Sequence, residues 1–294
     1  MNELFLPPLG GVPQPRFNPH LLSAPKRRVR IAVFGSFYGG YHVLRELLRP
    51  PLADQVTVVG VATDDITQPF VHANVRLWKY PHTRAEELLV PNFASEHALP
   101  VYTGRVKTPE FDRMFVAEWN PDLCLMATFG QKIPLHLIQV PRLGFFNFHH
   151  SSPTWPSYPG PDPIRDMQRD GRTHLVLTLH RVSEVIDDGE FFARSHPVKI
   201  PPGVNAIEMH RITWPQMGGF ISSAVEEILD AEATDRDDCG SMTMHEEPVP
   251  YIVGEKFSPR ARARRSADRC MAGLPQRLGR SLLDTARRRW HNPH

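Results

Sequence analysis

The chain has 294 residues and a formal net charge of +2, and its 41% hydrophobic and 22% charged content is typical of a globular protein. The three cysteines, Cys124, Cys239 and Cys270, are far apart and form no CxxC pair, which argues against a disulfide framework or a zinc ribbon. No run approaches 18 apolar residues, and residues 1–28 lack the pattern of a secretory signal. We therefore expect a cytoplasmic protein without a membrane partner.

Charge and proline are unevenly distributed along the chain. The 30 prolines are about twice the usual ~5% share, so many connections should be stiff. Residues 255–294 carry eleven Lys or Arg against three acidic residues, which leaves the rest of the chain mildly acidic. We interpret 257–294 as a basic, solvated tail; a contact with RNA or with an acidic partner is the alternative.

The first half of the chain alternates strands with helices. An irregular arm (1–28) precedes an apolar strand at 28–36, a helix at 39–48 and a second buried strand that ends near residue 64. This strand–helix–strand order is typical of a parallel sheet. Residues 66–94 show no readable pattern.

The later elements continue the alternation. At 108–119 we expect a helix with Thr108 as N-cap and Pro109 in its first turn. Further strands are expected at 101–104, 122–130, 143–150, 173–182 and 189–200, with helices at 134–139 and within 205–229, the last interrupted by Pro215. The pattern predicts a Rossmann-like, twisted and mostly parallel α/β sheet with helices on both faces. We divide the chain into a domain at 29–230, a short extension at 231–256 and the tail.

Polar residues end the strand LGFFNFHH at 143–150. Side chains alternate along a strand, so Asn147 and His149 share one face and His150 takes the other. In an open α/β sheet the ligand crevice lies beyond the carboxyl ends of the strands. There, an Asn amide can donate to a developing oxyanion, and a His can exchange protons near neutral pH.

A second polar group follows the next strand. Thr178 and His180 share a face near its end, and Asp187 stands seven residues later in a turn-like DDG. Asn, His and Asp together suit acid–base chemistry and oxyanion stabilisation at a carbonyl carbon. The sequence FGSFYGG around Gly35 suits either an anion at a helix N-terminus or a plain strand–helix turn, and it carries no dinucleotide fingerprint.

These segments carry a family resemblance over residues 30–225. NFHHSSPTWPSYPGPDPI, followed by THLVLTLHRVSEVIDDGEFF, resembles the core motif of the folate-dependent formyltransferases. The residues that match in order are Asn147, His149, Ser151, Pro153, Gly160, Thr178, His180, Asp187 and Gly189. Two further segments, VFGSFYGGYHVLRELL and DLCLMATFGQKIP, resemble the family's first strand and helix and its folate-lining segment.

The resemblance implies a reaction and a set of roles. A formyl group would pass from 10-formyltetrahydrofolate to an amine, with no metal needed. Asn147 and a protonated His149 would donate to the oxyanion, and Asp187 would set the protonation of His149 and relay the proton of the amine. His180, Thr178 and Ser151 would support them. The implied folate-binding residues are Met126, Ala127, Phe129, Gly130, Ile133 and Asp187.

The chain departs from the family pattern where the acceptor should bind. His150 replaces the usual proline, and the loop that follows is longer and more aromatic than usual. We assign the acceptor contacts to His150, Trp155, Tyr158, Gly35 and Tyr38.

The expected acceptor is a small amine, with a hydroxyornithine-type siderophore precursor favoured over an amino-sugar nucleotide and no nucleic-acid partner. A methionyl-tRNA formyltransferase-like enzyme and a non-catalytic nucleotide- or RNA-binding module are the alternatives. The sequence leaves the assembly open, a dimer included.

Overall fold

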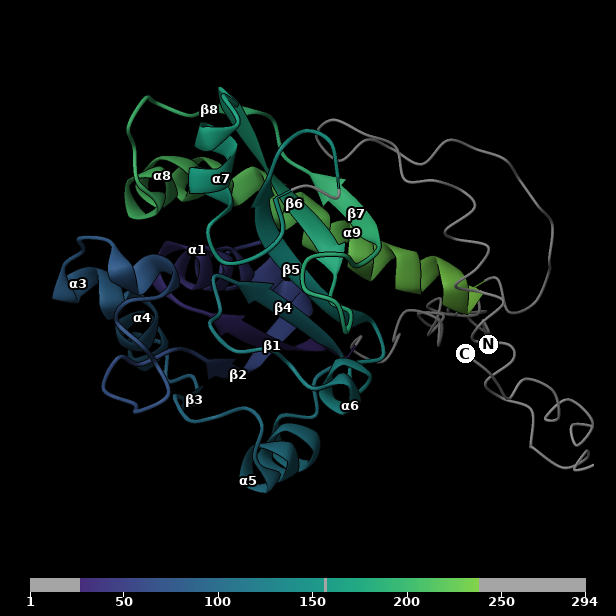
Figure 1. The fold of residues 1–294 in the computed structure, drawn as a ribbon. Coiled ribbons are helices and arrows are strands. Elements are labelled where there is room, and N and C mark those ends of the chain that lie inside the picture. Colours follow the sequence, from purple (N-terminus) through teal and green to yellow (C-terminus); the bar gives the residue numbers. More distant parts are fainter. Residues whose placement is uncertain (1–26, 156–157, 238–294) are drawn as a thin grey trace, which may run out of the picture.

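A mixed sheet runs through the computed structural model, which describes residues 27–155 and 158–237 (Figure 1). Its strand order is β3-β2-β1-β4-β5-β6-β7, and β8 pairs with β6 beside this path. The strands are β1 Val29–Gly35, β2 Val56–Ala62, β3 Val101–Tyr102, β4 Leu123–Ala127, β5 Gly144–Ser151, β6 His174–Arg181, β7 Phe191–Arg194 and β8 Val198–Lys199.

β6 is the one strand of the described sheet that runs against the others. β1, β2, β3, β4 and β5 pair in parallel, whereas β6 runs antiparallel to β5, β7 and β8. The predicted mostly parallel α/β sheet is confirmed. The antiparallel step is important for the site, because its register sets His180 directly across from Asn147 and Thr178 across from His149.

Helices cover both faces of the sheet, as expected (Figure 1). α1, α4, α8 and α9 contribute to one apolar cluster, and α5, η3 and α6 to the other. The helices are α1 Phe37–Leu47, α2 Leu52–Gln55, η2 Arg76–Lys79, α3 Arg84–Glu87, α4 Leu89–Glu96, α5 Pro109–Arg113, η3 Met114–Trp119, α6 Leu135–Ile138, α7 Pro163–Arg169, α8 Ala206–Thr213, η4 Trp214–Gln216 and α9 Gly218–Asp237. None in the described ranges is long and apolar enough to cross a bilayer.

Local sequence signals account for several helix ends. Thr108 caps α5 by accepting a hydrogen bond from the amide of Phe111, and Pro109 occupies the first turn, as predicted. The expected interruption at Pro215 is a short 3₁₀ turn, η4, between α8 and α9. The stretch 66–94, which carries no readable pattern, folds into three short helices and connecting turns. Nearly all of the predicted N-terminal arm (1–28) and the whole of the basic tail lie outside the described residues.

Close packing on β2 offers a test of the second apolar cluster. A Cβ atom added at Gly60 would lie 2.1 Å from Cε2 of Trp119, whose ring is buried in that cluster. Gly60→Ala should therefore lower the free energy of unfolding by about 1–3 kcal/mol, because overpacking displaces the indole. Urea denaturation measures this. Gly219→Ala is the matched control, since a Cβ there meets nothing within 4 Å; equal stability of the two variants would contradict the packing argument.

Candidate active site

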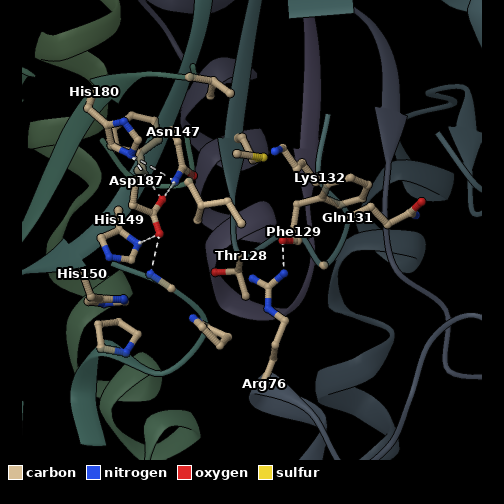
Figure 2. A pocket seen from close by; sticks show the side chains of 18 of the residues that line it. Arg76, Thr128, Phe129, Gln131, Lys132, Asn147, His149, His150, His180 and Asp187 are labelled. Carbon is tan, nitrogen blue, oxygen red and sulfur yellow. Dashed lines mark hydrogen bonds and ion pairs between the residues drawn. The ribbon is translucent and has the colours of Figure 1, made fainter. Parts of the chain in front are cut away.

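A cavity of about 340 Å³ opens at the end of the sheet where β4 and β5 terminate (Figure 2). Its wall includes Asn147, His149, His180 and Asp187, which the sequence analysis had grouped from strand alternation, the DDG turn and the family resemblance. Most of the other residues in the cavity wall come from the loop that follows β4, the turn that follows β6, η2 and α8. The predicted crevice beyond the carboxyl ends of the strands is therefore present.

Asp187 is the centre of the polar network in this cavity. Its Oδ1 accepts a hydrogen bond from Nδ2 of Asn147 at 3.1 Å, and its Oδ2 accepts one from the amide of Gly160 at 2.9 Å (Figure 2). Nδ1 of His149 and Nε2 of His180 each lie 3.6 Å from a carboxylate oxygen. Asp187 has a φ of 51°, the left-handed conformation that Asp tolerates better than most residues. This turn aims the carboxylate back over β5.

The environment keeps Asp187 ionised. Burial by itself raises the pKa of the carboxyl, but the hydrogen bond with His180, the charge of His149 and the amide of Gly160 outweigh it. The net result is a pKa of about 2. At neutral pH the cavity therefore contains a fixed negative charge in contact with two imidazoles.

His180 is fixed in one tautomer by its neighbours. Its Nδ1 lies 2.8 Å from the carbonyl oxygen of Arg181, which can only accept, so this nitrogen carries a proton. In the neutral ring Nε2 is then an acceptor, and Nδ2 of Asn147 lies 3.2 Å from it. The indole of Trp155 stacks on the ring with centroids 4.6 Å apart. His180 thus contacts Asn147 and lies beside Asp187; its supporting role stays a prediction.

His149 faces two acceptors. Nε2 donates to the carbonyl oxygen of Tyr158 at 3.0 Å, and Nδ1 points to Asp187. Burial lowers the pKa of His149 below its ordinary value, although Asp187 and the Tyr158 carbonyl raise it. The resting ring is therefore neutral at pH 7, with Nδ1 free to take a proton beside Asp187. The expected donation from a protonated His149 to the oxyanion stays a prediction.

The loop after β4 lies on the side of the cavity opposite the histidines. Hydrogen bonds hold its main chain in place. Gly130 donates its amide to Oδ2 of Asp64 at 2.7 Å, and a Cβ at Gly130 would overlap that carboxylate. Gln131 is tied to the amide of Val106 and to the carbonyl of Gly104. Of the predicted folate residues, Met126, Phe129, Gly130, Ile133 and Asp187 line the cavity. Ala127 does not, because it is buried within the sheet.

Arg76 is a cavity residue that the sequence did not reveal. It lies on η2 with a φ of 54°, and its guanidinium donates to the carbonyl oxygen of Phe129 (Figure 2). Burial lowers its pKa, while Asp64 and Asp187 raise it. The stretch 66–94 has no periodic signal, so nothing in the sequence placed this cation opposite the acid–base group. His210 on α8 was also missed, because an isolated histidine on a helix gives no periodic signal, and the main-chain contacts of Tyr158 and Gly160 carry no residue signal.

Four of the expected acceptor contacts lie outside the cavity wall. Gly35 packs against Gly40 and the carbonyl of Ala127, which is the plain strand–helix turn that we had considered. Tyr38 donates its hydroxyl to Glu86 at 2.9 Å. Trp155 stacks on His180, and the Tyr158 hydroxyl accepts a hydrogen bond from Arg172. His150 does line the cavity.

Two of the expected supporting residues do not contact the cavity directly. Thr178 and Ser151 are buried and hydrogen-bonded to each other across β5 and β6. Neither lines the cavity. Their bond joins the two strands that carry the acid–base residues. No group of three potential metal ligands occurs among residues 27–155 and 158–237.

Comparison with known proteins gives one family match. Residues 30–211 match the family model described as "Formyl transferase". The chain is 31% identical over 134 residues to a methionyl-tRNA formyltransferase of Geobacter metallireducens, covering 44% of this chain and 42% of that protein. A second such protein, from Syntrophomonas wolfei, is 25% identical over 201 residues, covering 68% and 60%. The chain thus spans about half the length of these relatives.

Solved structures share the fold. A glycinamide ribonucleotide transformylase 1 from Geobacillus kaustophilus superposes with a TM-score of 0.52 at 19% identity, covering 69% of this chain and 100% of that one. A formyltetrahydrofolate deformylase from Pseudomonas syringae gives a TM-score of 0.51 at 20% identity, covering 75% and 64%.

The low pKa of Asp187 predicts a pH-dependent contribution to stability. A carboxyl whose pKa is depressed on folding stabilises the protein above its unfolded value near 3.8, and this contribution disappears as the pH falls toward 2. Asp187→Asn should therefore be less stable than the wild type at pH 6 by about 2 kcal/mol, and the gap should narrow from pH 5 downward. Urea unfolding at stepped pH measures it. If the difference in the free energy of unfolding did not change with pH, the assignment of a negative charge to Asp187 would be refuted.

Proposed function

The chain belongs to the formyl transferase family of enzymes, and we propose that it moves the formyl group of 10-formyltetrahydrofolate to the nitrogen of a small amine. The observation that carries this proposal is the meeting of Asn147, His149 and Asp187 at one end of the cavity. Together they offer an amide donor, a neutral imidazole and a fixed carboxylate, which is the set needed for attack on a carbonyl carbon.

The co-substrate fits the wall formed by the loop after β4 and the turn after β6. Met126, Phe129 and Ile133 give this wall an apolar surface, and main-chain groups of the rigid loop are available to a heterocycle. Val185 and Ile186 also line the cavity, although they are 60% and 56% exposed. Apolar side chains in that position suit the flat rings of a folate.

The proposed reaction follows from the protonation states of the site. The amine lone pair attacks the formyl carbon, and the carbonyl electrons move to the oxygen, toward which Asn147 can donate. Nδ1 of His149 takes the proton of the attacking nitrogen, and Asp187 stabilises the resulting imidazolium. Collapse of the oxyanion breaks the bond to the folate nitrogen, which leaves with that proton. The products are an N-formylated amine and tetrahydrofolate.

For the acceptor we propose a hydroxyornithine-type amine, with an amino-sugar nucleotide as the second small acceptor. The cavity volume of about 340 Å³ and its single arginine suit a compact molecule with an acidic group. Methionyl-tRNA is the alternative acceptor of another kind, and the names of the relatives favour it. Incubation with formyl-folate and each acceptor in turn distinguishes them: we expect tetrahydrofolate to form with a small amine, and formation with charged initiator tRNA alone would reverse this choice.

A binding module without chemistry is the alternative of another class. It predicts salt-sensitive binding of RNA and no consumption of formyl-folate. The same incubation, followed at the absorbance of tetrahydrofolate formation, separates the two classes.

Removal of the Asn147 amide tests the catalytic assignment. Asn147→Ala should lower kcat by about 10²–10³-fold, because one preorganised donor to the oxyanion is lost, and Asp187→Ala should lose most turnover. Assays of tetrahydrofolate formation, stopped at fixed times, measure kcat for each variant. His174→Ala is the matched control, since His174 is exposed at the other end of β6. Turnover of Asn147→Ala within threefold of the wild type would rule out the assigned role.

A further inference from the structure

Two buried histidines that the proposed chemistry does not use lie together in the cavity wall. His150 on β5 and His210 on α8 are 4% and 6% exposed, and their ring centroids are 4.6 Å apart. His150 projects from the face of β5 opposite to that of Asn147 and His149, and its ring also meets Trp214 edge-on. The pair therefore forms a polar patch separate from the acid–base group but in the wall of the same cavity; Figure 2 labels His150 below His149.

The hydrogen bonds of this pair are incomplete. Nε1 of Trp214 can only donate, and it lies 3.1 Å from Nδ1 of His210, so the neutral His210 ring carries its proton on Nε2. Nε2 of His150 is buried and has no hydrogen-bond partner within the described ranges. A buried polar atom without a partner is destabilising and is uncommon in native proteins. The wall of the cavity thus contains an N–H donor of His210 and a buried, unsatisfied ring nitrogen of His150.

The surroundings keep both rings neutral. The pKa of His210 is lowered to about 3, mainly by burial and also by the charge of Arg76, while the charge of Asp162 opposes this shift. Burial also lowers the pKa of His150 strongly, and His210 and His149 add to the effect. Apolar side chains line the cavity nearby, among them Leu77, Phe148, Ile164 and Ala206. A neutral donor and acceptor in such a setting suit an uncharged polar group.

We propose that His150 and His210 form a hydroxyl-binding subsite that selects the acceptor. A hydroxyl donates one hydrogen bond and accepts others, so one group can satisfy the His210 N–H and the His150 nitrogen together. A site built to pair with a hydroxyl rejects an analogue without it, since its own buried polar groups are then left unpaired. This inference rests on the proposed function and adds the chemical feature that the acceptor carries.

Two kinds of acceptor supply such a hydroxyl. In a hydroxylamine-type amine it lies on the attacking nitrogen, and in an amino sugar it lies on the ring. The probes for the test are therefore N5-hydroxyornithine against ornithine, and a nucleotide-linked amino sugar against its deoxy analogue. Each pair differs by one hydroxyl, so the preferred pair identifies the source.

The experiment measures steady-state kinetics of the whole chain with saturating 10-formyltetrahydrofolate. The wild type should favour the hydroxylated probe in kcat/KM by about 10–100-fold over its partner. His150→Phe and His210→Phe keep a flat ring but remove the nitrogens; each should raise KM for the hydroxylated probe about 10–100-fold and change kcat less than threefold. Against the probe without the hydroxyl, the same variants should behave like the wild type.

Controls separate recognition from loss of structure. His42→Phe removes another buried histidine with an unpaired nitrogen, Nδ1, on α1 and away from the cavity, and it should leave both KM values unchanged. The stable analogue 5-formyltetrahydrofolate should bind the wild type and both cavity variants with equal affinity in calorimetry. His150→Asn restores a donor and an acceptor in place of the ring and should recover part of the preference for the hydroxyl.

The outcomes bear separately on the two proposals. Formyl transfer by the wild type without preference for a hydroxyl, or equal losses on both members of a probe pair, overturns the subsite while the proposed function stands. Folate binding with no transfer to either probe pair shows that the acceptor class is wrong, and the subsite falls with it. Absence of folate binding by the wild type refutes the proposed function itself.

Discussion

A single buried carboxylate, that of Asp187, holds the reactive end of the sheet together. Because its charge is removed from water, it must be matched by donors from its surroundings. β5 supplies the amide of Asn147 and the loop after β5 supplies the amide of Gly160, while the rings of His149 and His180 lie 3.6 Å from the carboxylate. The left-handed turn at Asp187 brings the charge back over these strands. The antiparallel pairing of β5 with β6 makes this geometry possible.

The same network restrains the catalytic amide. Asn147 has two N–H groups on Nδ2, and the structure engages them with Asp187 and with Nε2 of His180. Both partners are acceptors, which fixes the orientation of the amide. For Asn147 to donate to an oxyanion, one of these two hydrogen bonds must therefore break. In the proposed reaction, transfer of the amine proton to Nδ1 of His149 would give Asp187 a charged partner 3.6 Å away.

Much of this arrangement was accessible from the sequence, for identifiable physical reasons. Strand alternation placed Asn147 and His149 on one face, and the cap at Thr108 and the break at Pro215 follow from local backbone chemistry. Arg76 and His210 could not be found in this way. They reach the cavity through tertiary packing of η2 and α8, and an isolated Arg or His gives no periodic signal. Backbone donors and acceptors, such as the carbonyl of Tyr158, carry no residue signal at all.

Chemistry and recognition therefore come from different parts of the chain. The acid–base group comes from β5 and from the turn after β6, where Asp187 lies. Much of the remaining cavity wall comes from η2, α8 and the loop after β4. β5 belongs to both parts, because neighbouring residues on one strand face opposite sides: His149 meets Asp187, and His150 meets His210. Under the two proposals, the acid–base group accounts for the transfer of the formyl group, and the histidine pair on the opposite face of β5 accounts for the choice of acceptor.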